Sequence, residues 1–481
     1  MAAGGVSSRT LAKFSFALDV RRLANGWSVS AAIPWLILIL GLIAYHQVYT
    51  VYRFDTPVHG DGEGYYAYIP AYLLHGDPSF STLIRDHIIP MYASLGHQPP
   101  SQFGLTLQAT GNWLDRYGIG VAVLLLPFFA IGHLIAVVGG STPDGYSLPE
   151  TFAAGTAAIV YTTAGLLILR PVLRRWFPGW AIAVTLVAIV FGTSLFDFTT
   201  WDSVTSHAFS FFAVSLALLL ALRWYDRSTM WRAAAVGVVA GLVIDLRLTD
   251  IVLLAALPLL GVGSRAALRD RVRLFSERWT HLLAVLACMV VVFIPQSITW
   301  YIATGHWLVN SYSGESFDFL HPRLIESLFW FNPHGLLPYA PVLVLAFIGL
   351  GVAWARRRDI ALPVTVAFVP LWYTIASWYD WSYAASFGHR GFIDILPLLA
   401  LPMAYLLSLM RTRVLRLAAI CGVGILTAVT CALMLAYWQY KISGGGIDAG
   451  GYFALLRHPH RLFGPPDFPS WFTPLVQHGR R

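Results

Sequence analysis

The apolar stretch AAIPWLILILGLIAYHQVYTVY, residues 31–52, is followed at residues 59–68 by the polar stretch HGDGEGYYAY. An apolar run of this length can cross the roughly 30 Å of hydrocarbon in a bilayer as a helix. No small-residue cleavage site follows the run, so we expect it to remain as an uncleaved anchor helix. The sequence therefore opens with a membrane span that leads directly into a loop containing carboxylates.

The composition extends this reading to the whole chain. Of 481 residues, 57% are hydrophobic and 12% are charged, whereas about a quarter are charged in an average soluble domain. The three cysteines, Cys288, Cys421 and Cys431, lie inside apolar runs and are interpreted as small core residues. The net charge of +8 comes mainly from arginines in short clusters between apolar runs, which argues against nucleic-acid binding. The predicted fold class is an all-α, polytopic transmembrane helical protein.

The basic residues orient the spans, because cytoplasmic loops carry an excess of Lys and Arg. Basic residues precede the first run, so the N-terminus is predicted to be cytoplasmic and residue 53 onward extracytoplasmic. Five later clusters are expected to be cytoplasmic: Arg170/Arg174/Arg175, Arg223/Arg227/Arg232, Arg265 to Arg278, Arg356/Arg357/Arg358 and Arg411/Arg413/Arg416. This pattern predicts eleven spans, at approximately 31–52, 152–170, 179–197, 204–222, 233–246, 250–264, 281–303, 337–355, 360–378, 391–410 and 417–437.

One apolar run does not fit the alternation. If residues 120–138 crossed the membrane, every later arginine cluster would move outside. We therefore interpret this run as a re-entrant or interfacial helix inside a large first extracytoplasmic loop, residues 53–151. The alternative is an ordinary membrane span. The predicted organisation is a cytoplasmic segment at 1–30, a transmembrane domain at 31–437 and a Gly- and Pro-rich extracytoplasmic tail at 438–481.

Polar residues that can take part in catalysis or binding are concentrated in the segments predicted to face outside. The sharpest group is Asp61 and Glu63, two carboxylates between glycines directly after the first span. Glycines let a backbone approach a ligand closely, and such carboxylates can act as a general base or hold a divalent cation. The structural alternative is a solvated acidic turn that caps the following helix.

These residues carry a resemblance. Asp61-Gly-Glu63-Gly-Tyr-Tyr after the first span resembles the acidic motif of the C-type (GT-C fold) glycosyltransferase superfamily, which includes protein O-mannosyltransferases and lipid A aminoarabinose transferases. Further similar pieces follow over most of residues 31–410: Ser206-His207-Ala208, GLVIDLRLTD, LFWFNPHGLLPYAPVLVLAFIGL and FGHRGFIDILPLLALP. The family's acidic pair is adjacent, whereas Gly62 separates the two carboxylates here, so the resemblance assigns the catalytic carboxylate to Asp61 and leaves the role of Glu63 open.

The resemblance implies a cell-membrane enzyme that moves a sugar from a polyprenyl-phosphate donor to an extracytoplasmic glycan, lipid or protein acceptor. Asp61 would deprotonate the acceptor, and a leaving phosphate calls for cationic or hydrogen-bonding partners. The candidates for donor-phosphate binding are Arg390, His389 and Arg247, and a divalent cation, Mg or Mn, bound by Asp61 and Glu63 is a candidate cofactor. Further substrate-binding candidates are Tyr65, Tyr66, His207, Asp250, His334 and Asp380.

These assignments have alternatives, in which the residues have structural roles or the protein belongs to another class. Arg390 and Arg247 also fit interfacial arginines that extend their charge to the membrane surface, and His207 and His334 also fit packing or capping residues. A multi-span transporter or flippase of a lipid-linked or envelope substrate is the main alternative class, because the hairpin at 233–264 is a broken element. A matching broken element is not evident elsewhere. A non-catalytic polymer-binding subunit is the third alternative.

Overall fold

The computed structural model describes residues 29–53, 56–94, 104–312, 314–383, 385–463 and 466–467. The predicted cytoplasmic segment up to residue 28 and the end of the predicted tail lie outside these residues. Each of the eleven predicted spans coincides with helical structure. In the described part of the chain, seven helices are long and apolar enough to cross a membrane. The prediction of an all-α polytopic membrane protein is thereby confirmed.

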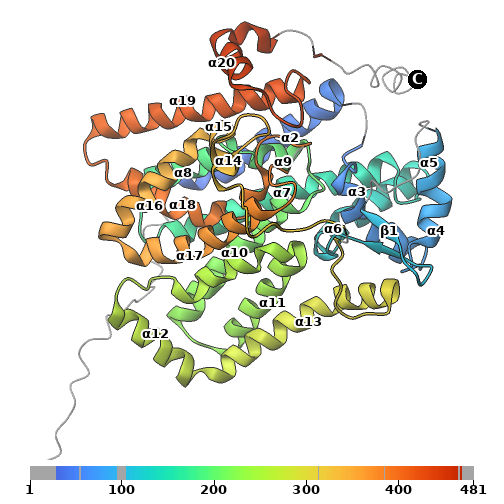
Figure 1. Cartoon of the computed structure of the whole chain (residues 1–481), viewed down its shortest axis with the longest axis horizontal. Coiled ribbons are helices and arrows are strands. Elements are labelled where there is room, and N and C mark those ends of the chain that lie inside the picture. The colour runs from blue at the N-terminus through green and yellow to red at the C-terminus, as the bar shows by residue number, and fades with distance from the viewer. Residues whose placement is uncertain are drawn as a thin grey trace, which may run out of the picture.

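Helices follow one another along the described part of the chain (Figure 1). The long or apolar helices are α2 (Val29–Gln47), α6 (Gly120–Gly139), α7 (Leu148–Leu173), α8 (Gly179–Phe191), α10 (Ser206–Asp226), α11 (Met230–Leu246), η4 (Leu248–Leu259), α13 (Trp279–Thr304), α16 (Val344–Arg356), α17 (Arg358–Ser377), α18 (Leu396–Ser408) and α19 (Arg413–Trp438). Shorter helices connect them: η1 (Val48–Tyr52), α9 (Leu195–Thr200), α12 (Arg265–Glu277), α14 (Leu324–Phe329), α15 (Leu336–Tyr339), η5 (Pro341–Leu343), η6 (Arg390–Phe392), α20 (Ala449–Arg457) and η7 (Pro459–Phe463).

Some predicted spans are broken helices. The predicted span 179–197 divides at Gly192, which follows α8 and packs so closely on Val342 that a side chain would collide with it. The predicted span 337–355 begins as two short turns that contain Pro338 and Pro341, and its regular helix starts only at Val344. Proline removes a backbone donor and clashes with the preceding turn. Hydropathy alone does not register these breaks.

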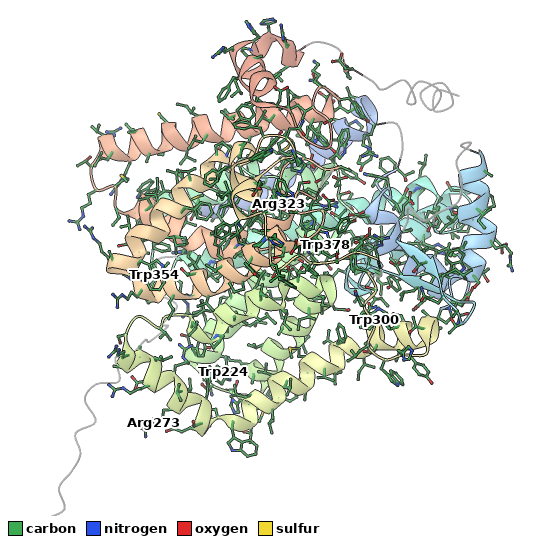
Figure 2. All side chains as sticks on the ribbon, in the orientation of Figure 1. Trp224, Arg273, Trp300, Arg323, Trp354 and Trp378 are labelled. Atoms are coloured by element: carbon green, nitrogen blue, oxygen red, sulfur yellow. The ribbon has the colours of Figure 1, made fainter. Side chains whose placement is uncertain are left out.

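The five arginine clusters lie at one end of the helical bundle, which we call the arginine end. Contacts link the clusters to one another: Arg175 with Asp226, Arg271 with the ring of Tyr225, Gly263 with Asp359, Arg357 with the ring of Tyr405, and Arg416 with the ring of Trp180. This end is on the left in Figure 1 and holds Trp224, Arg273 and Trp354 in Figure 2. The compartment that this end faces remains a prediction.

The opposite end, which we call the site end, carries the first loop. Helices α2 and α7 run antiparallel, because Arg170 bonds Ser30 at the arginine end while the ring of Phe152 contacts Tyr45 at the other. The first loop contains α3 (Asp61–Ile69), η2 (Pro70–Leu74), α4 (Ser81–Leu83), η3 (Ile84–Ile88), α5 (Ile89–Ser94) and the antiparallel pair β1 (Leu105–Leu107) and β2 (Trp113–Asp115). This loop lies on the right in Figure 1.

Helix α6, the predicted re-entrant or interfacial segment, is a continuous helix of 20 residues. By length and composition it is one of the candidate spans. Its contacts nevertheless remain at the site end: Gly120 packs against the backbone of Asp245 and Leu246 at the end of α11, and Gly132 packs against Glu150 at the start of α7. Helix α6 therefore accompanies the site-end half of α7, and its placement relative to a membrane stays a prediction.

Candidate functional site

Helix α3 places Asp61 at its first position. The residue before it, Gly60, has φ of 55°, a left-handed conformation that glycine adopts without a steric penalty. One residue later, Gly62 lies so close to Val204 that an added Cβ would be 3.2 Å from that side chain. The glycines on either side of Asp61 thus turn the chain into the helix and let the helix lie against the segment before α10.

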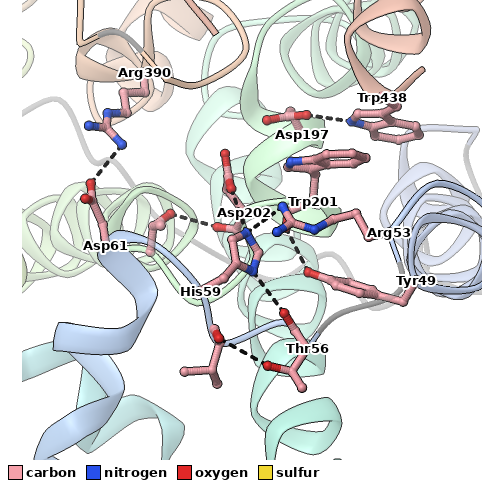
Figure 3. Close-up of polar contacts among 12 residues, drawn as sticks. Tyr49, Arg53, Thr56, His59, Asp61, Asp197, Trp201, Asp202, Arg390 and Trp438 are labelled. Carbon is pink, nitrogen blue, oxygen red and sulfur yellow. Dashed lines mark hydrogen bonds and ion pairs between the residues drawn. The ribbon is translucent and has the colours of Figure 1, made fainter. Parts of the chain in front are cut away.

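Both carboxylate oxygens of Asp61 have a partner from a distant part of the chain. Arg390 Nη1 donates to Oδ2 at 2.8 Å, and the hydroxyl of Tyr117 donates to Oδ1 at 2.8 Å. Figure 3 shows the Asp61–Arg390 pair. The Asp61 side chain keeps 36% of its exposure, so a ligand can still reach it. Burial raises the pKa of Asp61, but Arg390 and Tyr117 together hold that pKa below its usual range.

Tyr117 is a site residue that the sequence did not single out. It follows β2, its ring stands 4.4 Å from the ring of Tyr65, and its carbonyl accepts a hydrogen bond from Tyr68 at 2.7 Å. Tyr65, a predicted substrate-binding residue, also donates its hydroxyl to Ser206 at 3.0 Å. Tyr65 therefore belongs to the wall beside Asp61. No local pattern around Tyr117 distinguishes it from the other aromatic residues of the chain.

A second arginine lies near the same tyrosine ring as the first. The guanidinium carbons of Arg390 and Arg247 stand 5.7 Å and 5.8 Å from the centroid of the Tyr383 ring. Tyr383 has φ of 51°, a left-handed conformation that is uncommon for residues other than glycine. Such strained residues cluster at functional sites. The structure thus brings together the two arginines that the sequence nominated for a phosphate.

The two histidines near Arg390 do not add charge to this region at neutral pH. His389 is buried, and burial lowers its pKa well below the usual range. Burial likewise lowers the pKa of His334 to about 4. Both imidazoles are therefore neutral near pH 7, and the positive charge around Asp61 comes from Arg390 and Arg247.

The remaining predicted residues are more scattered. Tyr66, on α3, is fully buried and donates its hydroxyl to the carbonyl of Gly145. Asp380 accepts a hydrogen bond from Ser382 at 3.1 Å within the loop that leads to Arg390. His207 and Asp250 lie close to Arg247, as described below.

Glu63 and Asp61 do not form a pair. They are two residues apart in α3, and helix positions at this spacing do not face each other. In the described ranges, no group of three or more His, Cys, Asp or Glu side chains is arranged to hold a metal ion. The Mg or Mn site on these two carboxylates stays a prediction.

A second polar cluster lies beside Asp61 (Figure 3). His59 Nε2 is 2.8 Å from Arg53 Nη1 and 3.1 Å from Asp202 Oδ1, and Arg53 lies 4.8 Å from the ring centroid of Trp201. These contacts join the end of the first span to the segment between α9 and α10. They fix the chain on the N-terminal side of Asp61.

Comparisons with known proteins give structural matches alone. No family model and no curated protein sequence matches the chain. The apo crystal structure of ArnT from Cupriavidus metallidurans matches at 13% identity with a TM-score of 0.47, covering 84% of this chain and 65% of that one. The archaeal oligosaccharyltransferase AglB from Archaeoglobus fulgidus, in complex with an inhibitory peptide and a dolichol-phosphate, matches at 10% identity and a TM-score of 0.45, covering 93% and 59%.

The apo form of the Archaeoglobus fulgidus oligosaccharyltransferase also matches, at 11% identity and a TM-score of 0.45, covering 91% of this chain and 60% of that one. ArnT and AglB are membrane glycosyltransferases of the GT-C fold, the class that the first-loop motif resembles. The chain spans 59–65% of the length of these structures. Because the identities and TM-scores are this low, the function has to be inferred from the residues of this chain.

Proposed function

We propose that this chain is an integral membrane glycosyltransferase that moves a sugar from a polyprenyl-phosphate donor to a hydroxyl group of an extracytoplasmic glycan, lipid or protein. The observation that carries the proposal is the contact of Asp61 with Arg390 at 2.8 Å, beside a second guanidinium at Arg247. A carboxylate that can accept a proton and a pair of cations that can receive a phosphate are the two groups that this transfer requires.

Asp61 acts as the general base. The acceptor hydroxyl attacks the anomeric carbon of the donor sugar while its proton passes to Asp61, and the bond between the anomeric carbon and the phosphate oxygen breaks. The partial exposure of Asp61 supports this role, because the acceptor has to come within hydrogen-bond distance.

Arg390 and Arg247 receive the leaving group. The polyprenyl phosphate gains negative charge as the glycosidic bond breaks, and fixed guanidiniums in a site shielded from water stabilise that charge. Arginine suits this role because its planar fork can donate two hydrogen bonds to one phosphate. The location at the site end supports the proposal too, since apolar helices such as α2 and α7 reach that end and can face the lipid part of the donor.

The test is direct. Purified protein is incubated with a panel of polyprenyl-phosphate sugars and acceptors, and the release of free polyprenyl phosphate is measured. A glycosyltransferase releases polyprenyl phosphate in step with sugar transfer for one donor of the panel. A transporter or flippase would instead move the intact lipid-linked sugar between the leaflets of a vesicle without releasing polyprenyl phosphate, and that result would refute the proposal.

A further inference from the structure

Arg247 is held from behind by a compact group of buried side chains that we call the Arg247 anchor: Asp394, His207 and Asp250. Arg247 Nε is 3.1 Å from Asp394 Oδ2, and its Nη1 is 3.3 Å from His207 Nε2. Asp250 lies on a further side, with Oδ1 4.0 Å from Arg247 Nε. The anchor residues come from α10, η4 and the turn before α18, so only the tertiary fold assembles them.

The hydrogen bonds fix the form of His207. Its Nδ1 lies 3.1 Å from Asp394 Oδ1, and its Nε2 faces a guanidinium nitrogen that can only donate. Nε2 must therefore be the acceptor, and Nδ1 must carry the proton that is donated to Asp394. Both ring nitrogens of His207 are thus engaged with the protein. In this arrangement His207 acts on Arg247, and its predicted contact with substrate stays a prediction.

The side chains of Asp394 and His207 are less exposed than that of Arg247, which they hold. The side chains of Asp394 and His207 are 1% and 2% exposed, whereas Arg247 keeps 14%. A ligand at the site end can therefore touch Arg247 but cannot touch Asp394. The guanidinium meets the anchor through the ion pair of Nε with Asp394 and through the contact of Nη1 with His207.

We infer that Asp394, with His207, is a positioning residue that holds Arg247 in place to receive the phosphate of the donor. This inference rests on the proposed function. A free arginine side chain loses much conformational entropy when it is ordered on a ligand. A guanidinium already fixed by a carboxylate and an imidazole has lost that entropy on folding, so phosphate binding is strengthened.

The test measures binding of undecaprenyl monophosphate and, separately, of undecaprenol, which has the same tail without the phosphate. For the wild-type protein we expect a clear preference for the phosphate. Asp394→Asn should lower the affinity for undecaprenyl phosphate about tenfold, which corresponds to about 1.4 kcal/mol. The affinity for undecaprenol should be unchanged. A general loss of structure would weaken the binding of both lipids alike.

Asp197→Asn is the matched control. Asp197 is equally buried and accepts a hydrogen bond from Trp438 at 2.6 Å, which an asparagine oxygen can also accept. The Asp197→Asn variant should therefore keep the preference for undecaprenyl phosphate over undecaprenol. A double-mutant cycle with Arg247→Lys adds a second criterion: if Asp394 acts through Arg247, the combined loss should be smaller than the product of the two single losses. Fully independent losses would overturn the inference.

The outcomes separate the two proposals. If the wild-type protein shows no preference for the phosphate, the proposed function fails. If the wild-type protein prefers the phosphate and Asp394→Asn keeps that preference, only the positioning role fails. If Asp394→Asn does not fold, His207→Gln replaces it in the same measurements, and an unchanged phosphate preference in that variant overturns the inference equally.

Discussion

Arg390 Nη1 lies 2.8 Å from Asp61 Oδ2, across 329 positions of the sequence. The group proposed to receive the phosphate is thus paired with the group proposed to receive the proton. A phosphate that draws Arg390 toward itself weakens this pair. Because Arg390 lowers the pKa of Asp61, weakening the pair makes Asp61 a stronger base. Donor binding would then precede proton transfer from the acceptor.

Asp61→Asn should remove most of the activity. Asparagine keeps the shape of the side chain but cannot take up the acceptor proton, and general-base catalysis contributes roughly 10²–10⁴-fold in rate. The initial rate of sugar transfer at saturating donor is the measurement, with detergent-solubilised yield and thermal midpoint as the checks on folding. An Asp61→Asn protein that transfers sugar at the wild-type rate would exclude Asp61 as the base.

Glu63→Gln provides the contrast within the same helix. Since Asp61 and Glu63 stand two positions apart in α3 and face different directions, this variant should keep most of the sugar-transfer rate. If chelator and Glu63→Gln both reduce the rate as strongly as Asp61→Asn does, a metal bridges the two carboxylates after all.

Arg390→Lys should weaken use of the donor more than use of the acceptor. Lysine retains the charge but not the planar pair of donors that matches a phosphate. We expect the KM for the polyprenyl-phosphate sugar to rise about tenfold, a change of about 1.4 kcal/mol, while the KM for the acceptor changes little. Steady-state kinetics with each substrate varied in turn make the comparison. Unchanged donor kinetics would remove Arg390 from the phosphate site.

Tyr117→Phe should change the pH dependence of the reaction. The Tyr117 hydroxyl is one of the groups that lower the pKa of Asp61, so the wild-type carboxylate remains ionised down to a pH below its usual pKa of about 3.9. Removal of the hydroxyl raises that pKa, and activity should be lost at a higher pH on acidification. The pH–rate profile measures this. Tyr65→Phe, which removes a hydroxyl bonded to Ser206 instead, is the control.

The topology has its own test. Asp144 and Arg174 are both exposed and stand at the opposite ends of α7. Single cysteines at these positions should react with an impermeant thiol reagent from opposite sides of the membrane, Asp144 from outside and Arg174 from the cytoplasm. If both react from the same side, α7 does not cross as predicted. If they react from exchanged sides, the whole orientation is inverted.

The sequence by itself determined the class of the protein and the position of its polar end. The length of the apolar runs and the spacing of the arginine clusters are local properties, because a helix that crosses hydrocarbon satisfies its backbone hydrogen bonds within one segment. The eleven helical segments were predictable for this reason. Asp61 could be nominated from its place directly after the first span and from the family resemblance. Arg390 and Arg247 could be nominated because a leaving phosphate calls for cationic partners.

The tertiary structure alone decided which of these residues meet. Gly192, Pro338 and Pro341 break predicted spans where hydropathy stays high. Tyr117 reaches Asp61, and Asp394 reaches Arg247, because the fold brings together segments that are far apart in the chain, so no sequence window contains either pair. The helix beginning at Asp61 also separates Asp61 from Glu63, although they are near neighbours in sequence. Direction around a helix and proximity across a bundle are properties of the folded chain.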